Sequence, residues 1–407
     1  ANTAMGRGAL STQTATSNNS AFGYQALAAN TTGTPNDAFG YQALYSNTTG
    51  SFNVAIGYQA LTANTTGVNN TAVGNAALAA NTVGLQNTAV GYLSCDANVS
   101  GRDNTSVGYG SLHLNTASSN TAVGSLALRS NTTGTPNDAF GFQALYSNTT
   151  GYGNTAIGYQ TLNSNTTGLY NTAIGGGVPG LIGGALQGNT IGSSNVAVGG
   201  GALSSNTTGS QNVSVGTNAL GASVTGAYNT GLGYGALNLN LASYNTAVGA
   251  NALQKNTSGT PNDAFGYQAL VNNTTGNNNV AVGYASLSAN TIGGSNTAVG
   301  ASALASNTTG VSNTAVGGAA LNLNTTGIGN VAIGVSALAK NTFGNGNVAV
   351  GGDYYGVTGP ALFNNTTGSQ NTAVGISALY SQTTAVNNTV MGYQAAYSVT
   401  TGGSNVV

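Results

Sequence analysis

One five-residue motif, Asn–x–small–apolar–Gly, recurs along the whole chain at an almost constant spacing. Its 23 copies end at glycines from Gly6 to Gly392, and 18 of the 22 intervals between them are 17 residues long. The repeat reads N-T-A-V-G-Y-Q-A-L-x-x-N-T-T-G-x-x, and positions 1 to 17 are counted from the motif asparagine. Seventeen residues are too few for a helical-hairpin repeat, which needs about 33 or more.

The composition of the repeat favours short strands joined by tight turns. Glycine at positions 5 and 15 interrupts any helix of useful length, and the alternating, β-branched T-A-V segment is typical of a strand. We therefore predict an all-β fold, a parallel β-solenoid of about 23 coils with 17 residues in each. At about 4.8 Å per coil such a rod is roughly 110 Å long. We expect one repetitive domain over residues 1–407, uncapped at both ends.

The irregular intervals change length only at fixed places in the repeat. Two intervals of 24 residues carry insertions at 176–184 and 352–360, directly after a motif glycine. Solenoids tolerate length changes at such corners, so we expect both insertions to bulge from the same edge. Tyr354 and Tyr355 form the aromatic pair that we expect to be most exposed, and we predict a surface contact there.

Each repeat position predicts a place in the coil. Position 1 is always asparagine, and stacked asparagines form amide ladders; contact with a ligand is the alternative. Position 4 is always apolar and position 9 is nearly always leucine, which predicts the core. Position 3 is small and lies opposite position 4 in an alternating strand, so we expect it to lie against another chain, most simply around a three-fold axis. The residues of this predicted interface include Ala55, Ala72, Ala89 and Ala122.

The scarcity of charge excludes several classes of function. The 407 residues include only 5 Lys+Arg, 6 Asp+Glu and 1 His, with a net charge of −1. This charge gives no field that attracts nucleic acid, and no apolar run reaches the roughly 18 residues of a membrane helix. Catalysis normally needs paired titratable groups, so we predict no enzyme, no cofactor and no metal. We expect His113 on the surface and Cys95, in the position-9 column, in the core.

Two further features leave alternatives open. Aromatic residues at position 6, such as Tyr24, Tyr41 and Tyr58, predict either packing or a glycan-binding platform. Asp37, Asp138 and Asp263 at position 2 each follow a Pro-Asn pair, which favours a role in a turn; a cation on a three-fold axis is the alternative. The N-T-T corners also match the glycosylation acceptor Asn-x-Thr.

The motifs NSAFG, NVAIG (Asn53 to Gly57), NTSVG and NVAVG resemble the Ser-Val-Ala-Ile-Gly motif in YadA-type heads of trimeric autotransporter adhesins. Similar repeats occur in tail-fibre-like proteins. The resemblance implies a left-handed parallel β-roll and a homotrimer. This chain departs from the family in its asparagine at motif position 1 and in a longer coil, whose extra residues lie in the L-x-x-N-T-T-G corner.

The sequence as a whole predicts a structural, non-enzymatic fibre or adhesin segment that attaches to surfaces, cells or glycans. Its expected location is extracellular, on a cell or on a virion. The alternatives are the shaft of a phage tail fibre and an ice-binding solenoid. Ice binding needs a flat, regular threonine face, whereas the Thr-Thr pairs of this repeat precede a corner glycine. Because both ends lie inside a repeat, we also expect continuation of the array or end-to-end stacking into a filament.

Overall fold

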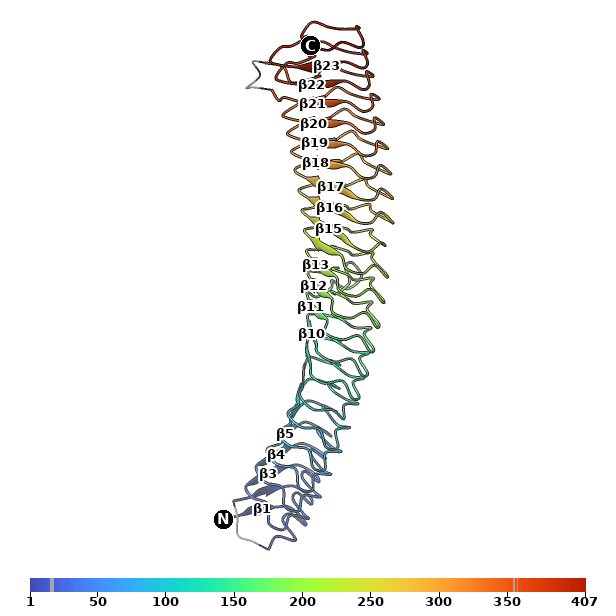
Figure 1. The fold of residues 1–407 in the computed structure, drawn as a ribbon. Coiled ribbons are helices and arrows are strands. Elements are labelled where there is room, and N and C mark those ends of the chain that lie inside the picture. The colour runs from blue at the N-terminus through green and yellow to red at the C-terminus, as the bar shows by residue number, and fades with distance from the viewer. Residues whose placement is uncertain (15–17, 354–355, 357) are drawn as a thin grey trace. The chain divides into compact units, whose positions relative to one another are not determined.

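The computed structural model describes residues 1–14, 18–353, 356 and 358–407. In these residues the chain forms 23 strands of three or four residues each and no helix. The contacts divide the chain into two units, Ala1–Thr208 and Gly209–Val407. Each unit is a parallel β-solenoid whose coils repeat about every 17 residues, which confirms the predicted fold class (Figure 1).

The strands coincide with positions 1 to 4 of the repeat. The strands of the first unit are β1 (Thr3–Met5), β2 (Ser20–Phe22), β3 (Asn36–Phe39), β4 (Asn53–Ile56), β5 (Thr71–Val73), β6 (Thr88–Val90), β7 (Thr105–Val107), β8 (Asn120–Val123), β9 (Asn137–Phe140), β10 (Asn154–Ile157), β11 (Thr172–Ile174) and β12 (Val196–Val198). The strands of the second unit are β13 (Val213–Val215), β14 (Thr230–Leu232), β15 (Asn245–Val248), β16 (Asn262–Phe265), β17 (Asn279–Val282), β18 (Thr297–Val299), β19 (Thr314–Val316), β20 (Val331–Ile333), β21 (Val348–Val350), β22 (Thr372–Val374) and β23 (Thr389–Met391).

Within each unit, consecutive strands pair in parallel and in register, so every repeat position forms a column. Ala55 of β4 lies opposite Ala72 of β5, which lies opposite Ala89 of β6. The same register continues through the 24-residue coil, where Thr172 of β11 lies opposite Val196 of β12. An insertion therefore leaves the columns above and below it aligned.

The strand faces are the reverse of those that we predicted from the sequence. Position 3, and not position 4, points into the coil: Ala55 is 0% exposed in the single chain, whereas Ile56 is 41% exposed. The predicted position-4 core is therefore wrong, although leucine at position 9 is buried as expected, for example at Leu61. The interior also holds alanine at position 8, as at Ala60. The coil is narrow, so each coil fills it with one large and two small apolar side chains.

The four alanines of the predicted subunit interface are all inside their own coil. They are 0% exposed without any partner chain: Ala55, Ala72, Ala89 and Ala122. Their small size is required by the packing within one chain, so they offer no surface to another. The last strand supports this explanation, because Val390 replaces the position-3 alanine in the coil where Ala396 replaces the position-9 leucine.

The position-9 residue turns the chain with a left-handed backbone conformation. Leu61 has a φ of 52°, and its amide donates to the Ala77 carbonyl of the next coil at 2.9 Å. Left-handed φ values are especially unfavourable for β-branched residues, which explains why leucine fills this column rather than valine or isoleucine. Glycine at position 5 also has a positive φ, 136° at Gly57, and a Cβ there would overlap the Gly74 backbone of the next coil.

Two ladders of buried asparagine side chains run through the interior. In the first ladder, at position 1, the Nδ2 of Asn53 donates to Asn36 Oδ1 at 3.1 Å and to the Gly67 carbonyl at 2.9 Å. In the second, at position 12, the Nδ2 of Asn64 donates to Asn47 Oδ1 at 2.8 Å and to the same Gly67 carbonyl at 3.0 Å. The predicted position-1 ladder is confirmed, and the position-12 ladder is an additional one.

The second ladder changes the interpretation of the N-T-T corners. Asn64 is 0% exposed and both of its amide hydrogens are engaged, so the folded corner does not present it for glycosylation. The first 16-residue coil has a shorter corner, N-T-A-S-S-N, and lacks one hydrogen bond of the second ladder. There Asn115 donates to the Ala117 carbonyl at 2.8 Å, and in the described part of the chain Asn98 Oδ1 is buried without a hydrogen-bond partner.

Asn64→Ala tests the contribution of the second ladder. The substitution leaves the buried Asn47 oxygen without its donor and the Asn81 amide without its acceptor in the next coil, so we expect it to lower the free energy of unfolding by about 1–3 kcal/mol. The measurement is chemical denaturation, with hydrogen exchange to locate the loosened coils. Thr66→Ala, at the exposed position 14 of the same corner, is the control and is expected to change stability by less than about 0.5 kcal/mol. Equal stability of the two variants would contradict a structural role for the ladder.

Candidate interaction surfaces

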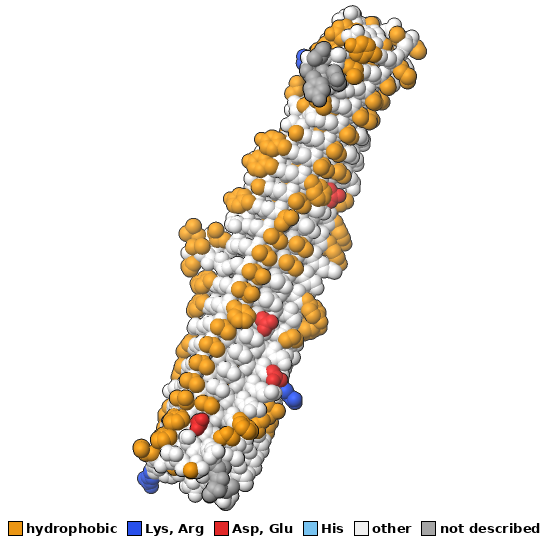
Figure 2. All heavy atoms as spheres, turned by 90° about the vertical axis from the view of Figure 1, so that its left-hand side faces the viewer, with side chains coloured by type: hydrophobic (Ala, Val, Ile, Leu, Met, Phe, Trp, Pro, Cys, Tyr) orange, Lys and Arg blue, Asp and Glu red, His pale blue; other side chains and the backbone are white. Residues whose placement is uncertain are grey.

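In each unit the outward side of the strands carries an apolar column, and we call the side chains at positions 2, 4 and 6 the strand face. Large position-4 side chains on this face are between 36% and 44% exposed in both units: Phe39, Ile56, Phe140, Ile157, Ile174, Leu232, Phe265, Val282, Val299, Val316 and Ile333. Figure 2 shows hydrophobic side chains in such rows, with few charged ones between them. Extended exposed apolar surface is typical of an interaction site.

Aromatic rings at position 6 border the apolar column. The rings of Tyr24, Tyr41 and Tyr58 stack on one another with centroid distances of 5.2 and 5.1 Å. In the second unit Tyr267 and Tyr284 stack at 5.6 Å. Stacking between coils supports the packing interpretation of this column, yet Tyr58 is still 50% exposed, so the rings also broaden the apolar surface.

Position 2 places threonine rows on the same face. Thr71, Thr88, Thr105 and Thr121 follow one another in register through β5 to β8. The sequence interpretation looked for threonine only in the N-T-T corner. The register of the strands shows instead that the Thr-x-Val pair of the motif lies on the outward face.

The clearest cluster of ionisable side chains lies in the position-10 column of the first unit. Asp96, His113, Arg129 and Tyr146 occupy successive coils. The Nδ1 of His113 lies 2.5 Å from Asp96 Oδ1, and the Nη1 of Arg129 donates to the Tyr146 hydroxyl at 3.3 Å. Within this column, Asp96 is therefore paired with His113, and Arg129 is paired with Tyr146.

Burial is the largest influence on the pKa of Asp96. It raises the pKa of Asp96, although the hydrogen bond and the charge of His113 act in the opposite direction. Burial raises the pKa of the neighbouring Cys95 to about 12, and the Asp96 charge adds to this. Cys95 is buried, as predicted, and remains a thiol at neutral pH. It therefore does not complete a nucleophilic site with His113, whose side chain is half-buried beside Asp96.

The other candidate residues do not converge on a site. Asp37, Asp138 and Asp263 lie in β3, β9 and β16, many coils apart. In the described residues, no group of three or more His, Cys, Asp or Glu side chains is placed to hold a metal ion. The described part of the chain also contains no helix with the length and apolarity needed to cross a membrane.

Both insertions leave their coil at the same place in the repeat and return to it in the same way. The Ala185 amide donates to the Gly175 carbonyl at 3.0 Å, and the Ala361 amide donates to the Gly351 carbonyl at 2.9 Å. The first insertion projects an apolar tip, where Leu181 is 83% exposed. In the second insertion, the predicted contact residues Tyr354 and Tyr355 lie outside the described residues.

Comparison with known proteins adds no assignment. No protein-family model matches the chain, and no curated protein matches it.

The raised pKa of Asp96 makes a prediction about pH. A carboxyl group whose pKa is raised by folding favours the folded state below its unfolded pKa, and this contribution is lost as pH rises through the folded pKa. We therefore expect Asp96→Asn to gain stability relative to the parent chain as pH rises from below the ordinary aspartate pKa of about 3.9 towards neutral pH. Thermal unfolding of both proteins across this range measures the difference. If the parent chain instead became more stable relative to the variant as pH rises, the pairing with His113 would outweigh burial in its effect on the pKa of Asp96.

Proposed function

We propose that this chain is a structural, non-enzymatic segment of an extracellular fibre or adhesin that associates with copies of itself through the strand face. The exposed apolar position-4 column carries this proposal. Its members recur once per coil in both units and lie beside the stacked position-6 rings. Burying this surface against another chain removes apolar area from water, which favours association.

The periodicity of the strand face suits a second copy of the same chain. In-register strands space the position-4 side chains one strand separation apart, so the rows of one copy match those of another without adjustment. A chain with only 3% charged residues has little charge repulsion to oppose such contacts. Three copies around an axis cover all three strand faces at once, and we propose a homotrimer of left-handed rolls on this basis together with the motif resemblance.

The oligomeric state of a position-4 variant tests this proposal. We expect the parent chain to sediment with three times the mass of one chain. The triple variant Ile56→Lys, Val73→Lys and Val90→Lys places desolvated charges in the contact, which is unfavourable, and should sediment as a monomer. Analytical ultracentrifugation measures both.

A matched control for this experiment carries the same three charges elsewhere. Thr32→Lys, Thr49→Lys and Thr66→Lys lie at the exposed position 14 of the corner and should leave the trimer intact. A parent chain that is monomeric at all concentrations, or a control that dissociates equally, would overturn self-association through the strand face.

The threonine rows at position 2 favour a second candidate function, ice binding. A flat array of regularly spaced hydroxyl and methyl groups is what this activity needs, and Thr71, Thr88 and Thr105 provide it beside the valines of position 4. If this face is free to bind ice instead of being covered by another copy, the parent chain shows thermal hysteresis that is lost in Thr88→Lys and kept in the control variant Thr66→Lys. If the parent chain forms the trimer and shows no thermal hysteresis, ice binding is contradicted and self-association remains the proposed function of this face.

A further inference from the structure

The second insertion lies beside a row of aromatic rings that does not belong to the strand face. Phe363, Tyr380 and Tyr397 occupy position 10 of three consecutive coils. Their centroids are 5.7 and 5.1 Å apart, and their planes differ by 4° and 6°. Aromatic carbons in contact are about 3.5–4.0 Å apart, so parallel rings at these centroid distances must be offset. Part of each ring face is therefore uncovered.

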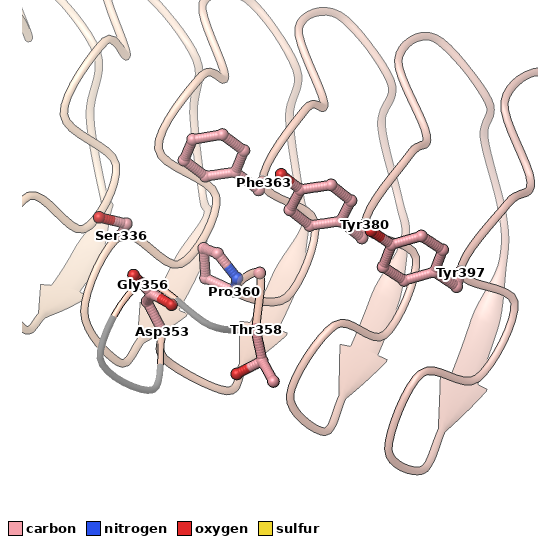
Figure 3. Close-up of a pocket in the computed structure, with 9 residues that line it drawn as sticks. Ser336, Asp353, Gly356, Thr358, Pro360, Phe363, Tyr380 and Tyr397 are labelled. Atoms are coloured by element: carbon pink, nitrogen blue, oxygen red, sulfur yellow. The ribbon is translucent and has the colours of Figure 1, made fainter.

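A cavity of about 330 Å³ lies between this row and the insertion. Figure 3 shows the three rings in one line, with Pro360 beside the Phe363 end and with Asp353 and Thr358 supplied by the insertion. The backbone around the cavity is anchored to neighbouring coils. The Asp353 amide donates to the Val335 carbonyl at 3.0 Å, and the Ser377 hydroxyl donates to the Gly359 carbonyl at 2.8 Å.

The polar groups of this cavity have unused hydrogen-bonding capacity. Among the residues that the structure describes, no Lys, Arg or His forms an ion pair with Asp353, and Thr358 Oγ1 is buried without a hydrogen-bond partner. A buried hydroxyl without a partner is unfavourable. The nearby cation is engaged elsewhere, since Lys340 Nζ lies 4.7 Å from the Phe363 ring centroid and donates to Asn364 Oδ1 at 2.9 Å.

From this geometry we propose that the cavity and the aromatic row form a binding site for a neutral polysaccharide. A sugar ring presents apolar C–H groups on its faces, which stack on aromatic rings, and hydroxyl groups at its edge, which hydrogen-bond to carboxylates and hydroxyls. Rings in three successive coils suit a linear chain that crosses the coils. The Asp353 carboxylate accepts from neutral hydroxyls and repels anionic glycans. The inference rests on the proposed attachment function and names the chemical class of the attached surface.

The same ring geometry elsewhere in the chain provides a matched control. Outside the strand face, Tyr228 ends a stacked pair with Tyr244 whose centroids are 5.0 Å apart, as Tyr397 ends the row beside the insertion. Both end residues are accessible, with exposures of 50% and 39%. If stacked tyrosines alone bind glycans, the two rows are equivalent; if the cavity and Asp353 are required, only the row beside the insertion binds.

The experiment uses the full chain and measures retention in native gels that contain hydroxyethylcellulose, galactomannan or laminarin, with anionic alginate for comparison. Cellohexaose titration, followed by tyrosine fluorescence because the chain has 20 Tyr and no Trp, gives an affinity. We expect retention by at least one neutral polymer and weaker retention by alginate. Tyr397→Ala should bind about tenfold more weakly, as expected for the loss of one aromatic contact. Asp353→Asn should also weaken binding, and Tyr228→Ala should not.

Two controls separate this inference from the proposed self-association. Circular dichroism confirms folding of each variant, and Asp353→Asn tests the site even if Tyr397→Ala is unstable. Sedimentation should give one oligomeric mass for all of them, so loss of glycan binding with the oligomer intact assigns the effect to the site. Absence of retention by every neutral polymer, stronger retention by alginate, or equal weakening in Tyr228→Ala and Tyr397→Ala would overturn the proposal.

Discussion

The hydrogen bond from a buried asparagine side chain to a corner glycine carbonyl is the interaction on which each coil depends. A 17-residue coil turns sharply several times, and its corners leave backbone carbonyls pointing inward where water does not reach. The Gly67 carbonyl accepts from both Asn53 and Asn64, so one carbonyl joins the two ladders. The remaining amide hydrogens connect neighbouring coils. A buried polar group is tolerated only when it is paired, and stacking identical coils provides the partner at every level.

This polar interior determines what the rest of the repeat can be. With two asparagines inside each coil, space remains for one leucine and two alanines, and the larger apolar residues of the motif face outward. The surface that results is unusual in being apolar, regular and almost free of charge. The same sequence can be repeated with few changes for two reasons. Inside, each coil provides hydrogen-bond partners for the coils next to it, and outside, the columns stay aligned for a partner of the same periodicity. Function then depends on departures from the repeat, and the insertion beside Phe363 provides one of them with a cavity of about 330 Å³.

The period predicted the fold, but it did not predict which strand face is buried. Alternation in the T-A-V segment places positions 3 and 4 on opposite faces but does not show which of them is inside. We assigned the larger residue, at position 4, to the core, and this prediction was wrong. The deciding signal was available in the last coil, where Val390 and Ala396 exchange size together. The sequence could also have predicted two sets of contacts, because the members of each set share position 10 in consecutive coils. These sets are the Asp96–His113 pair and the row of Phe363, Tyr380 and Tyr397. The sequence could not have predicted the left-handed backbone at Leu61 or the cavity beside the second insertion, since both depend on turn geometry that the repeat alone does not specify.

The central claim is that position 3 faces the interior and position 4 faces outward, and cysteine accessibility tests it most directly. Cysteine is introduced separately at Ala72 and at Val73, in a chain where Cys95 is replaced by alanine, and the rate of maleimide labelling is measured under native conditions. The account predicts rapid labelling at position 73 in the dissociated chain and labelling at position 72 only after denaturation. Rapid labelling at 72 with protection at 73 would contradict it.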